Sequence, residues 1–197
     1  MEYQKFKSKK GDWIDGPILL TPKIFFDERG YFYESWNFDT FKKIIGKEVK
    51  FLQDNHSKSF EGVIRGLHYQ MSPKPQAKLV RCTKGKIFDV AVDLRRNKST
   101  FKEWIGVELD STKKQQLWIP EGFAHGFLTI SNSSEVQYKT TNLWSMEYER
   151  AIIWNDFDLN IKWPINLSNE KINPIVSEKD KQAITLQKAI EAGDLFK

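Results

Sequence analysis

The chain has 197 residues, a length that one all-β domain can fill, and no internal repeat or linker divides it, so we expect a single domain over residues 1–197. Apolar residues make up 40% of it, but no apolar run approaches the ~18 residues of a membrane span, which excludes a membrane-embedded protein. The net charge of +5 comes from 31 basic residues scattered among 26 acidic ones, so we expect a solvated surface and no nucleic-acid partner.

The N-terminus and the cysteine content indicate the compartment. The first residues, MEYQKFKSKKGDW, lack the apolar core of a secretory signal. The single cysteine, Cys82, excludes an internal disulfide and suits a reducing environment. We therefore expect a cytoplasmic protein.

The N-terminal quarter predicts two extended segments followed by a short helix. The segments Pro17–Phe26 and Tyr31–Trp36 are joined by a tight connection in which Gly30 can take a positive φ. Asn37 can cap a helix over residues 37–45, and Gly46 can end it.

From residue 49 onward the chain becomes a series of short strands separated by turn signals, which indicates an all-β sandwich or barrel rather than a parallel sheet. We expect strands at Val49–Asn55, Gly62–Gln70, Lys78–Thr83, Lys86–Leu94, Phe101–Leu109, Gln115–Ile119, Ala124–Ser131 and Glu135–Thr141. A last helix is predicted over Ser177–Ala192, with Ser177 as its cap and Asp180 completing a capping box.

One stretch, GVIRGLHYQ at residues 62–70, places a histidine in mid-strand close to several cations. Strict alternation puts four residues on one face (Ile64, Gly66, His68, Gln70) and three on the other (Arg65, Leu67, Tyr69). Lys78 and Arg81 follow shortly afterwards. Burying several cations near one strand is costly without an anion to receive them, so the cluster indicates a pocket for an anionic small molecule.

A metal site is the first alternative for the histidines. The segment PEGFAH, which ends at His125, resembles half of the metal-binding signature of cupins, which are double-sheet jelly rolls. The other half needs a His-x-His pair, and Gln70 stands where the second histidine belongs. We therefore expect no metal, and a buried His125 that is hydrogen-bonded to an acid such as Asp89.

General acid–base chemistry is the second alternative. His68 is a candidate base, because an imidazole ordinarily titrates near ~6.5 and a carboxylate can fix its tautomer; a purely structural histidine is the competing interpretation. Lys78 could stabilise charge on a carbonyl oxygen when the neighbouring carbon loses a proton. Inversion needs a proton donor on the opposite face, for which Tyr138 is a candidate, although a packing tyrosine is the commoner case.

Seven motifs, in order and with similar spacing from about Pro17 to Asp180, resemble the dTDP-4-dehydrorhamnose 3,5-epimerase family. They are FDERG (26–30), QDNHS (53–57), RGLHYQ (65–70), KLVR (78–81), FDVAVD (88–93), PEGFAHGF (120–127) and SEKD (177–180). The resemblance implies a cupin-type double-sheet jelly roll with short peripheral helices, a homodimer, and no metal or organic cofactor. It also implies a dTDP-4-keto-6-deoxyhexose substrate that is epimerised beside the keto group.

The resemblance also implies roles for individual residues. His68 is implied as the base, Asp180 as its partner, Tyr138 as the acid on the other face, and Lys78 as the residue that stabilises the enolate. Arg65 is implied to hold the diphosphate. The remaining residues implied to contact nucleotide or sugar are Arg29, Glu34, Gln53, Asn55, His125, Trp144, Glu149 and Lys179.

One departure leaves the number of inverted carbons open. The family usually shows two aromatic residues, commonly tyrosines, where this chain has Leu143 and Trp144. Relatives that invert one carbon differ at the same place, so a single-centre epimerase at C3 or C5 is one alternative to a 3,5-epimerase. A 3,4-ketoisomerase, which also needs an enolising base, and a non-catalytic sugar-binding jelly roll are the other two.

Overall fold

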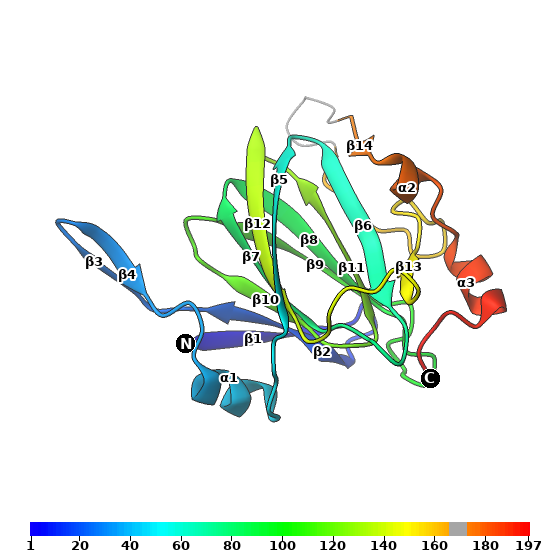
Figure 1. Cartoon of the computed structure of the whole chain (residues 1–197), viewed down its shortest axis with the longest axis horizontal. Helices are drawn as coiled ribbons and strands as arrows, with labels where there is room; N and C mark the ends of the chain where they lie inside the picture. The colour runs from blue at the N-terminus through cyan, green and yellow to red at the C-terminus, as the bar shows by residue number, and fades with distance from the viewer. Residues whose placement is uncertain (166–172) are drawn as a thin grey trace.

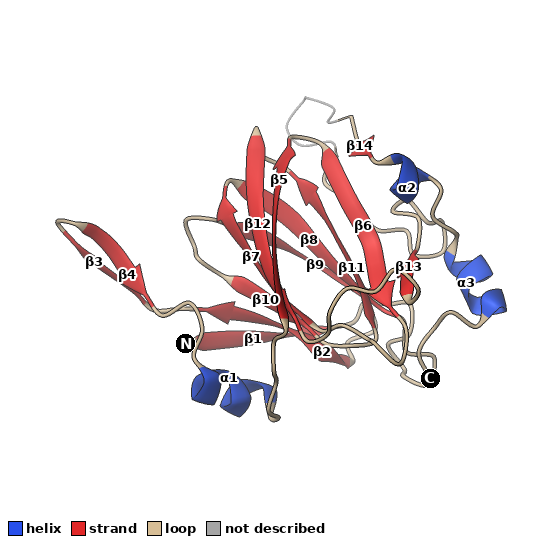
Figure 2. Cartoon of the chain, in the orientation of Figure 1, coloured by secondary structure: helices blue, strands red, loops and turns tan. Residues whose placement is uncertain are grey.

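Two facing β-sheets form the body of the protein in a computed structural model that describes residues 1–165 and 173–197 (Figure 1). The first sheet has the strand order β1 (Glu2–Lys7), β2 (Trp13–Thr21), β10 (Gln116–Ile119), β7 (Lys78–Lys84), β12 (Ser133–Thr140) and β5 (Gln53–Phe60). The second has the order β13 (Glu149–Ala151), β6 (Val63–Gln70), β11 (Phe123–Thr129), β8 (Lys86–Asp93) and β9 (Trp104–Asp110), and β14 (Ile175–Val176) pairs in parallel with β6. The other pairings in both sheets are antiparallel, which confirms the predicted double-sheet jelly roll (Figure 2).

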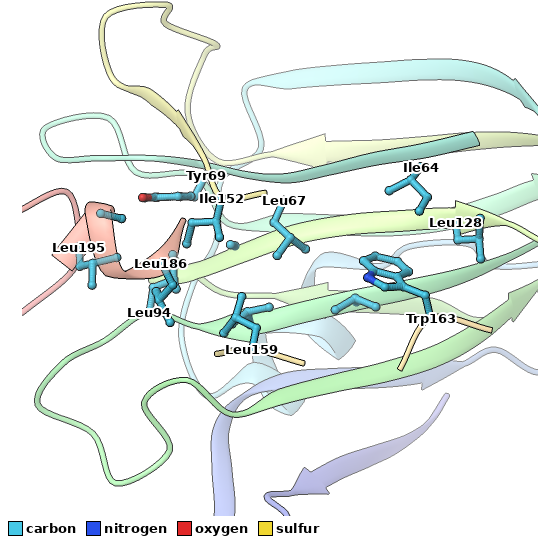
Figure 3. Packing of buried hydrophobic residues seen from close by; sticks show 14 residues of the cluster. Ile64, Leu67, Tyr69, Leu94, Leu128, Ile152, Leu159, Trp163, Leu186 and Leu195 are labelled. Atoms are coloured by element: carbon cyan, nitrogen blue, oxygen red, sulfur yellow. The ribbon is translucent and has the colours of Figure 1, made fainter. Parts of the chain in front are cut away.

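Two of the three buried apolar clusters lie on the two sides of the second sheet. Between the sheets, Val80 and Leu117 pack against side chains such as Ile87 and are fully buried. On its outer side, the second sheet is covered by the C-terminal part of the chain, where Leu67 and Leu186 belong to one buried cluster (Figure 3). This outer layer holds the C-terminal helices against β6.

The helices are short and peripheral, as expected, but one prediction about them is wrong. Helix α1 (Phe38–Ile45) has Asn37 as its N-cap and Gly46, at φ 78°, as its C-cap, which confirms the first helix. The predicted helix Ser177–Ala192 is instead two helices, α2 (Glu178–Lys181) and α3 (Leu186–Ala192). The chain is extended between them because the carbonyl of Ile184 accepts a hydrogen bond from the Ile153 amide. Among the described residues, no helix is long and apolar enough to span a membrane.

The prediction of a strand over Val49–Asn55 is also wrong at both ends. Val49 and Phe51 lie before β5 and pack into an aromatic cluster with Trp118. Strand β5 begins at Gln53 and continues to Phe60, paired along its whole length with β12. The sequence QDNHSKSF does not look like a strand because its inward-facing positions are polar, which suits a cavity wall and not a core.

Strands β3 (Ile24–Asp27) and β4 (Gly30–Tyr33) form a hairpin that projects away from the body (Figure 1). Gly30 has a φ of 126°, as predicted for the connection. The hairpin exposes Phe26 and Phe32 to 76% and 72%. Within one chain, these aromatic rings are not covered by the body.

Candidate active site

An irregularity in β6 determines which side chains face the space between the sheets. Pairing with β11 joins His125 to His68 but Phe127 to Arg65, so β6 carries one extra residue in this interval. Gly66 adopts a φ of 119°, and a Cβ at this position would lie 2.5 Å from the Cα of Gly126. The predicted alternation is therefore wrong: the bulge brings Arg65 and His68 to the same cavity, while Leu67 joins the outer core.

A cavity of about 510 Å³ lies between β6 and β11 on one side and β7 and β12 on the other. Seven of the residues that line it carry ionisable side chains: Arg65, His68, Lys78, His125, Tyr138, Lys179 and Asp180. All seven were identified from the sequence, and the fold brings them together from β6, β7, β11, β12 and α2.

His68 and Asp180 form a short hydrogen-bonded pair at one wall. The distance between His68 Nε2 and Asp180 Oδ1 is 2.6 Å, and the side chains are 30% and 5% exposed. Ser177 caps α2 through the Asp180 amide, as predicted, which places the Asp180 carboxylate against the imidazole. Burial acts to raise the pKa of Asp180, but the hydrogen bond and charge of His68 outweigh it, so the pKa lies below its usual value. An ionised Asp180 accepts the Nε2 proton and leaves Nδ1 of a neutral His68 as the basic nitrogen.

Lys78 is a buried cation at the same cavity. It is 7% exposed, and its Nζ lies 3.4 Å from the His68 carbonyl and 5.9 Å from the centre of the Tyr138 ring. Burial lowers the pKa of Lys78 to about 8, and the charges of Asp89 and Glu149 oppose the shift only partly. The ammonium is therefore present near neutral pH and poorly solvated, which strengthens its attraction for an anion.

Tyr138 reaches the cavity from β12, in the sheet opposite to that of His68. Burial raises the pKa of its phenol, against the influence of Arg65, so the hydroxyl keeps its proton at neutral pH. An imidazole with a basic nitrogen and a phenol that holds its proton thus face one cavity from opposite sheets.

His125 is paired with Asp89, as predicted. Its Nε2 lies 3.1 Å from both carboxylate oxygens, and the two side chains are 6% and 0% exposed. Burial lowers the pKa of His125 despite the opposing influence of Asp89. A neutral His125 with Nε2 directed at Asp89 can present Nδ1 as a hydrogen-bond acceptor.

Other predicted binding residues form three hydrogen-bonded groups, of which Arg65 and Lys179 line the cavity. Arg65 donates from Nε to Ser59 Oγ at 3.0 Å. Lys179 pairs with Glu149 at 2.5 Å. Gln53 donates to Asn55 Oδ1 at 2.8 Å and accepts from the Trp144 amide at 2.9 Å.

Two serines on the inward face of β5, Ser57 and Ser59, were not predicted from the sequence. The signal for them was the alternation in QDNHSKSF of uncharged polar residues, which face inward, with larger or charged ones, which face outward.

Two predicted binding residues lie elsewhere. Arg29 is on the projecting hairpin, 85% exposed and paired with Asp27 at 2.6 Å. Glu34 follows β4 and accepts a hydrogen bond from Asn37. Neither residue lines the cavity of its own chain, because the hairpin extends away from the sandwich (Figure 1).

The arrangement can be compared with known proteins. The family described as dTDP-4-dehydrorhamnose 3,5-epimerase matches residues 12–188. The chain belongs to this family. Epimerases of the family from Shigella flexneri and Pseudomonas aeruginosa are 51% and 50% identical to it, over 91% and 93% of this chain and 94% and 96% of the relatives.

Solved structures of epimerases share the fold. A Mycobacterium tuberculosis epimerase superposes with a TM-score of 0.93 at 32% identity, covering 100% of this chain and 94% of that one. A dTDP-6-deoxy-D-glucose-3,5-epimerase from Legionella pneumophila Philadelphia 1, in complex with dTDP-4-keto-L-rhamnose, has a TM-score of 0.87 and 39% identity, covering 100% and 98%. The cupin-type fold and the membership of an isomerase family are thus confirmed.

Proposed function

We propose that this protein epimerises carbons 3 and 5 of dTDP-4-dehydro-6-deoxy-D-glucose to give dTDP-4-dehydro-L-rhamnose. The observation that carries the proposal is the placement of His68 and Tyr138 in opposite sheets, with Lys78 in contact with the strand of one and near the ring of the other. Inversion of a carbon requires a base on one face of the sugar ring and an acid on the other, and this cavity supplies both.

The reaction begins with loss of a proton from the carbon beside the keto group. His68 takes this proton on Nδ1, and the electrons of the broken C–H bond form a C=C bond as the carbonyl becomes an enolate oxygen. The Lys78 ammonium stabilises that oxygen. Tyr138 then gives its hydroxyl proton to the carbon on the opposite face, the enolate returns to the ketone, and solvent reprotonates Tyr138 and removes the proton from His68.

The other predicted residues hold the substrate. Arg65, fixed by Ser59, binds the diphosphate, since its guanidinium is suited to two phosphate oxygens. His125 accepts a hydrogen bond from the sugar at Nδ1, and five further residues contact nucleotide or sugar: Gln53, Asn55, Trp144, Glu149 and Lys179. No metal or organic cofactor is needed in this scheme.

The enzyme acts as a cytoplasmic homodimer in this proposal. The aromatic hairpin β3–β4 is exposed in one chain, and Arg29 and Glu34 lie on or beside it, away from the cavity. A second copy of the chain accounts for the exposed hairpin and for the position of Arg29 and Glu34. The hairpin can pack on the partner and bring these side chains to the partner's cavity.

The test is incubation with dTDP-4-dehydro-6-deoxy-D-glucose in deuterated water, followed by NMR at each carbon. Exchange with inversion at C3 and C5 is the expected result. Exchange at neither carbon would refute the proposal, and a product with the keto group at C3 would indicate a ketoisomerase.

A single-centre epimerase is the second candidate, because Leu143 and Trp144 stand where the family usually has two aromatic residues. A dTDP-4-dehydrorhamnose 3-epimerase from Streptomyces niveus is 34% identical to this chain, over 91% of this chain and 84% of the relative. Inversion at only one carbon in the same NMR experiment would favour this candidate.

A further inference from the structure

Two connections cross from one sheet to the other at the lower end of the sandwich in Figure 1. Residues 71–77 lead from β6 to β7, and residues 141–148 lead from β12 to β13. Each connection adjoins a strand with a proposed catalytic group, since His68 is on β6 and Tyr138 is on β12. The geometry of this end therefore bears on the distance between base and acid.

One buried amide joins the two connections. Gln70 is 2% exposed, and its Nε2 donates to the carbonyls of Lys74 at 2.7 Å and Leu143 at 3.2 Å. Its Oε1 accepts from the Ser145 amide at 2.8 Å. Three backbone groups from both connections are thus satisfied by one side chain, which a hydrocarbon side chain of similar size could not do.

A second pair of hydrogen bonds joins the same two connections. Asn142 donates from Nδ2 to the Pro75 carbonyl at 2.7 Å, and the backbone carbonyl of Asn142 accepts from Gln76 Nε2 at 2.8 Å. The two connections are therefore held together by the side-chain amides of Gln70 in β6 and of Gln76 and Asn142 in the connections themselves.

We propose that Gln70 is a positioning residue that sets the separation between His68 and Tyr138 by tying together the two connections at this end of the sheets. This inference rests on the proposed function. Gln70 lies two residues after His68 in the same strand, so its bonds to residues 143 and 145 link the strand of the base to the chain that leaves β12. Gln70 is not among the residues that line the cavity.

Proton loss and inversion depend on this separation differently. Proton loss needs only His68 close to the carbon, whereas inversion also needs Tyr138 within reach on the other face. If the two sheets relax apart, the enolate still forms, but His68 returns a solvent-derived deuteron to the original face more often. The signature of the positioning role is exchange without inversion.

The experiment measures the ratio of exchange to inversion at each carbon for Gln70→Met in deuterated water. We expect this ratio to rise at least threefold over the wild-type ratio. Leu109→Ala, a core change on β9, a strand that contributes no residue to the cavity lining, is the control for lost stability and should lower both rates together.

An unchanged ratio in a folded Gln70→Met protein would overturn the inference. If Gln70→Met does not fold, Asn142→Ala removes a tie from a partly exposed side chain, and the same comparison applies: a raised ratio supports the inference and an unchanged one refutes it. Absence of exchange in the wild-type protein would instead refute the proposed function, so the two failures are distinguishable.

Discussion

His68 and Asp180 are 112 residues apart in the chain, yet Nε2 of one lies 2.6 Å from Oδ1 of the other. The contact depends on the C-terminal part of the chain, which packs on the outside of β6 and returns α2 to the edge of the cavity. It fixes the tautomer of the proposed base.

Asp180→Asn is expected to lower the rate of exchange at C3 and C5 by about 100-fold or more, because the amide cannot stabilise the imidazolium that forms during proton transfer. The far-UV spectrum should be unchanged, since Ser177 caps α2 through the backbone amide of residue 180. Glu178→Gln, on the exposed side of the same helix and paired with Lys181, is the matched control. Equal rates for the two variants would contradict the role of Asp180.

Tyr138→Phe is expected to separate exchange from inversion. The variant keeps His68 and Lys78, so deuterium should still enter the substrate, but inverted product should fall by about 100-fold because no acid faces the other side of the ring. NMR of the recovered sugar measures both quantities in one sample. Loss of both in equal proportion would assign Tyr138 to binding.

The pKa of Lys78 predicts that the rate of exchange falls at alkaline pH. Its pKa is about 8, so the ammonium that we propose stabilises the enolate is lost as the pH rises through that value. Stability should change in the opposite direction, because the unfolded chain binds more protons at this lysine above pH 8, and the free energy of unfolding then rises with pH.

Lys78→Met tests the same residue by substitution. Exchange should fall by about 100-fold and lose the alkaline limb near pH 8, while the melting temperature should stay equal or rise, since a poorly solvated buried charge is removed. A variant that melts much lower than the wild-type protein would show that the lysine stabilises the fold.

Gly66→Ala is expected to destabilise the protein by about 3 kcal/mol or more, because the new Cβ would meet the backbone of β11 at a positive φ. Gly30→Ala is the matched control, since Gly30 has a similar φ of 126° but open space around it, and it should cost only about 1 kcal/mol. Urea unfolding measures both. Similar losses would mean that strain alone, and not close packing of the bulge, explains the glycine.

Mixed dimers test where Arg29 acts. When Arg29→Ala and His68→Ala chains are unfolded together and refolded, about half of the dimers should be mixed, and each mixed dimer has one cavity with His68 and a partner's Arg29. We expect about a quarter of wild-type activity at limiting substrate. Activity no greater than that of the separately refolded parents would show that the hairpin does not serve the partner's site.

Period-two patterns and turn signals were sufficient for most of the strands, since side chains that face a core must be apolar and those that face water need not be. This rule failed at β5, where the inward-facing positions are polar and Ser57 lines the cavity. The helix prediction failed between α2 and α3, where a tertiary hydrogen bond to Ile184 interrupts a segment with helical composition.

The sequence by itself determined the fold class, the family and the chemical types gathered in the site, because these follow from local pattern and from motifs that are contiguous in the chain. Only the tertiary structure decided which of those residues meet. The bulge at Gly66 turns Arg65 to the face of His68, and long-range packing brings Asp180 to the imidazole. The same folding leaves Arg29 on a hairpin outside its own cavity. Such relationships depend on strand register and on contacts between distant segments, which no local pattern specifies.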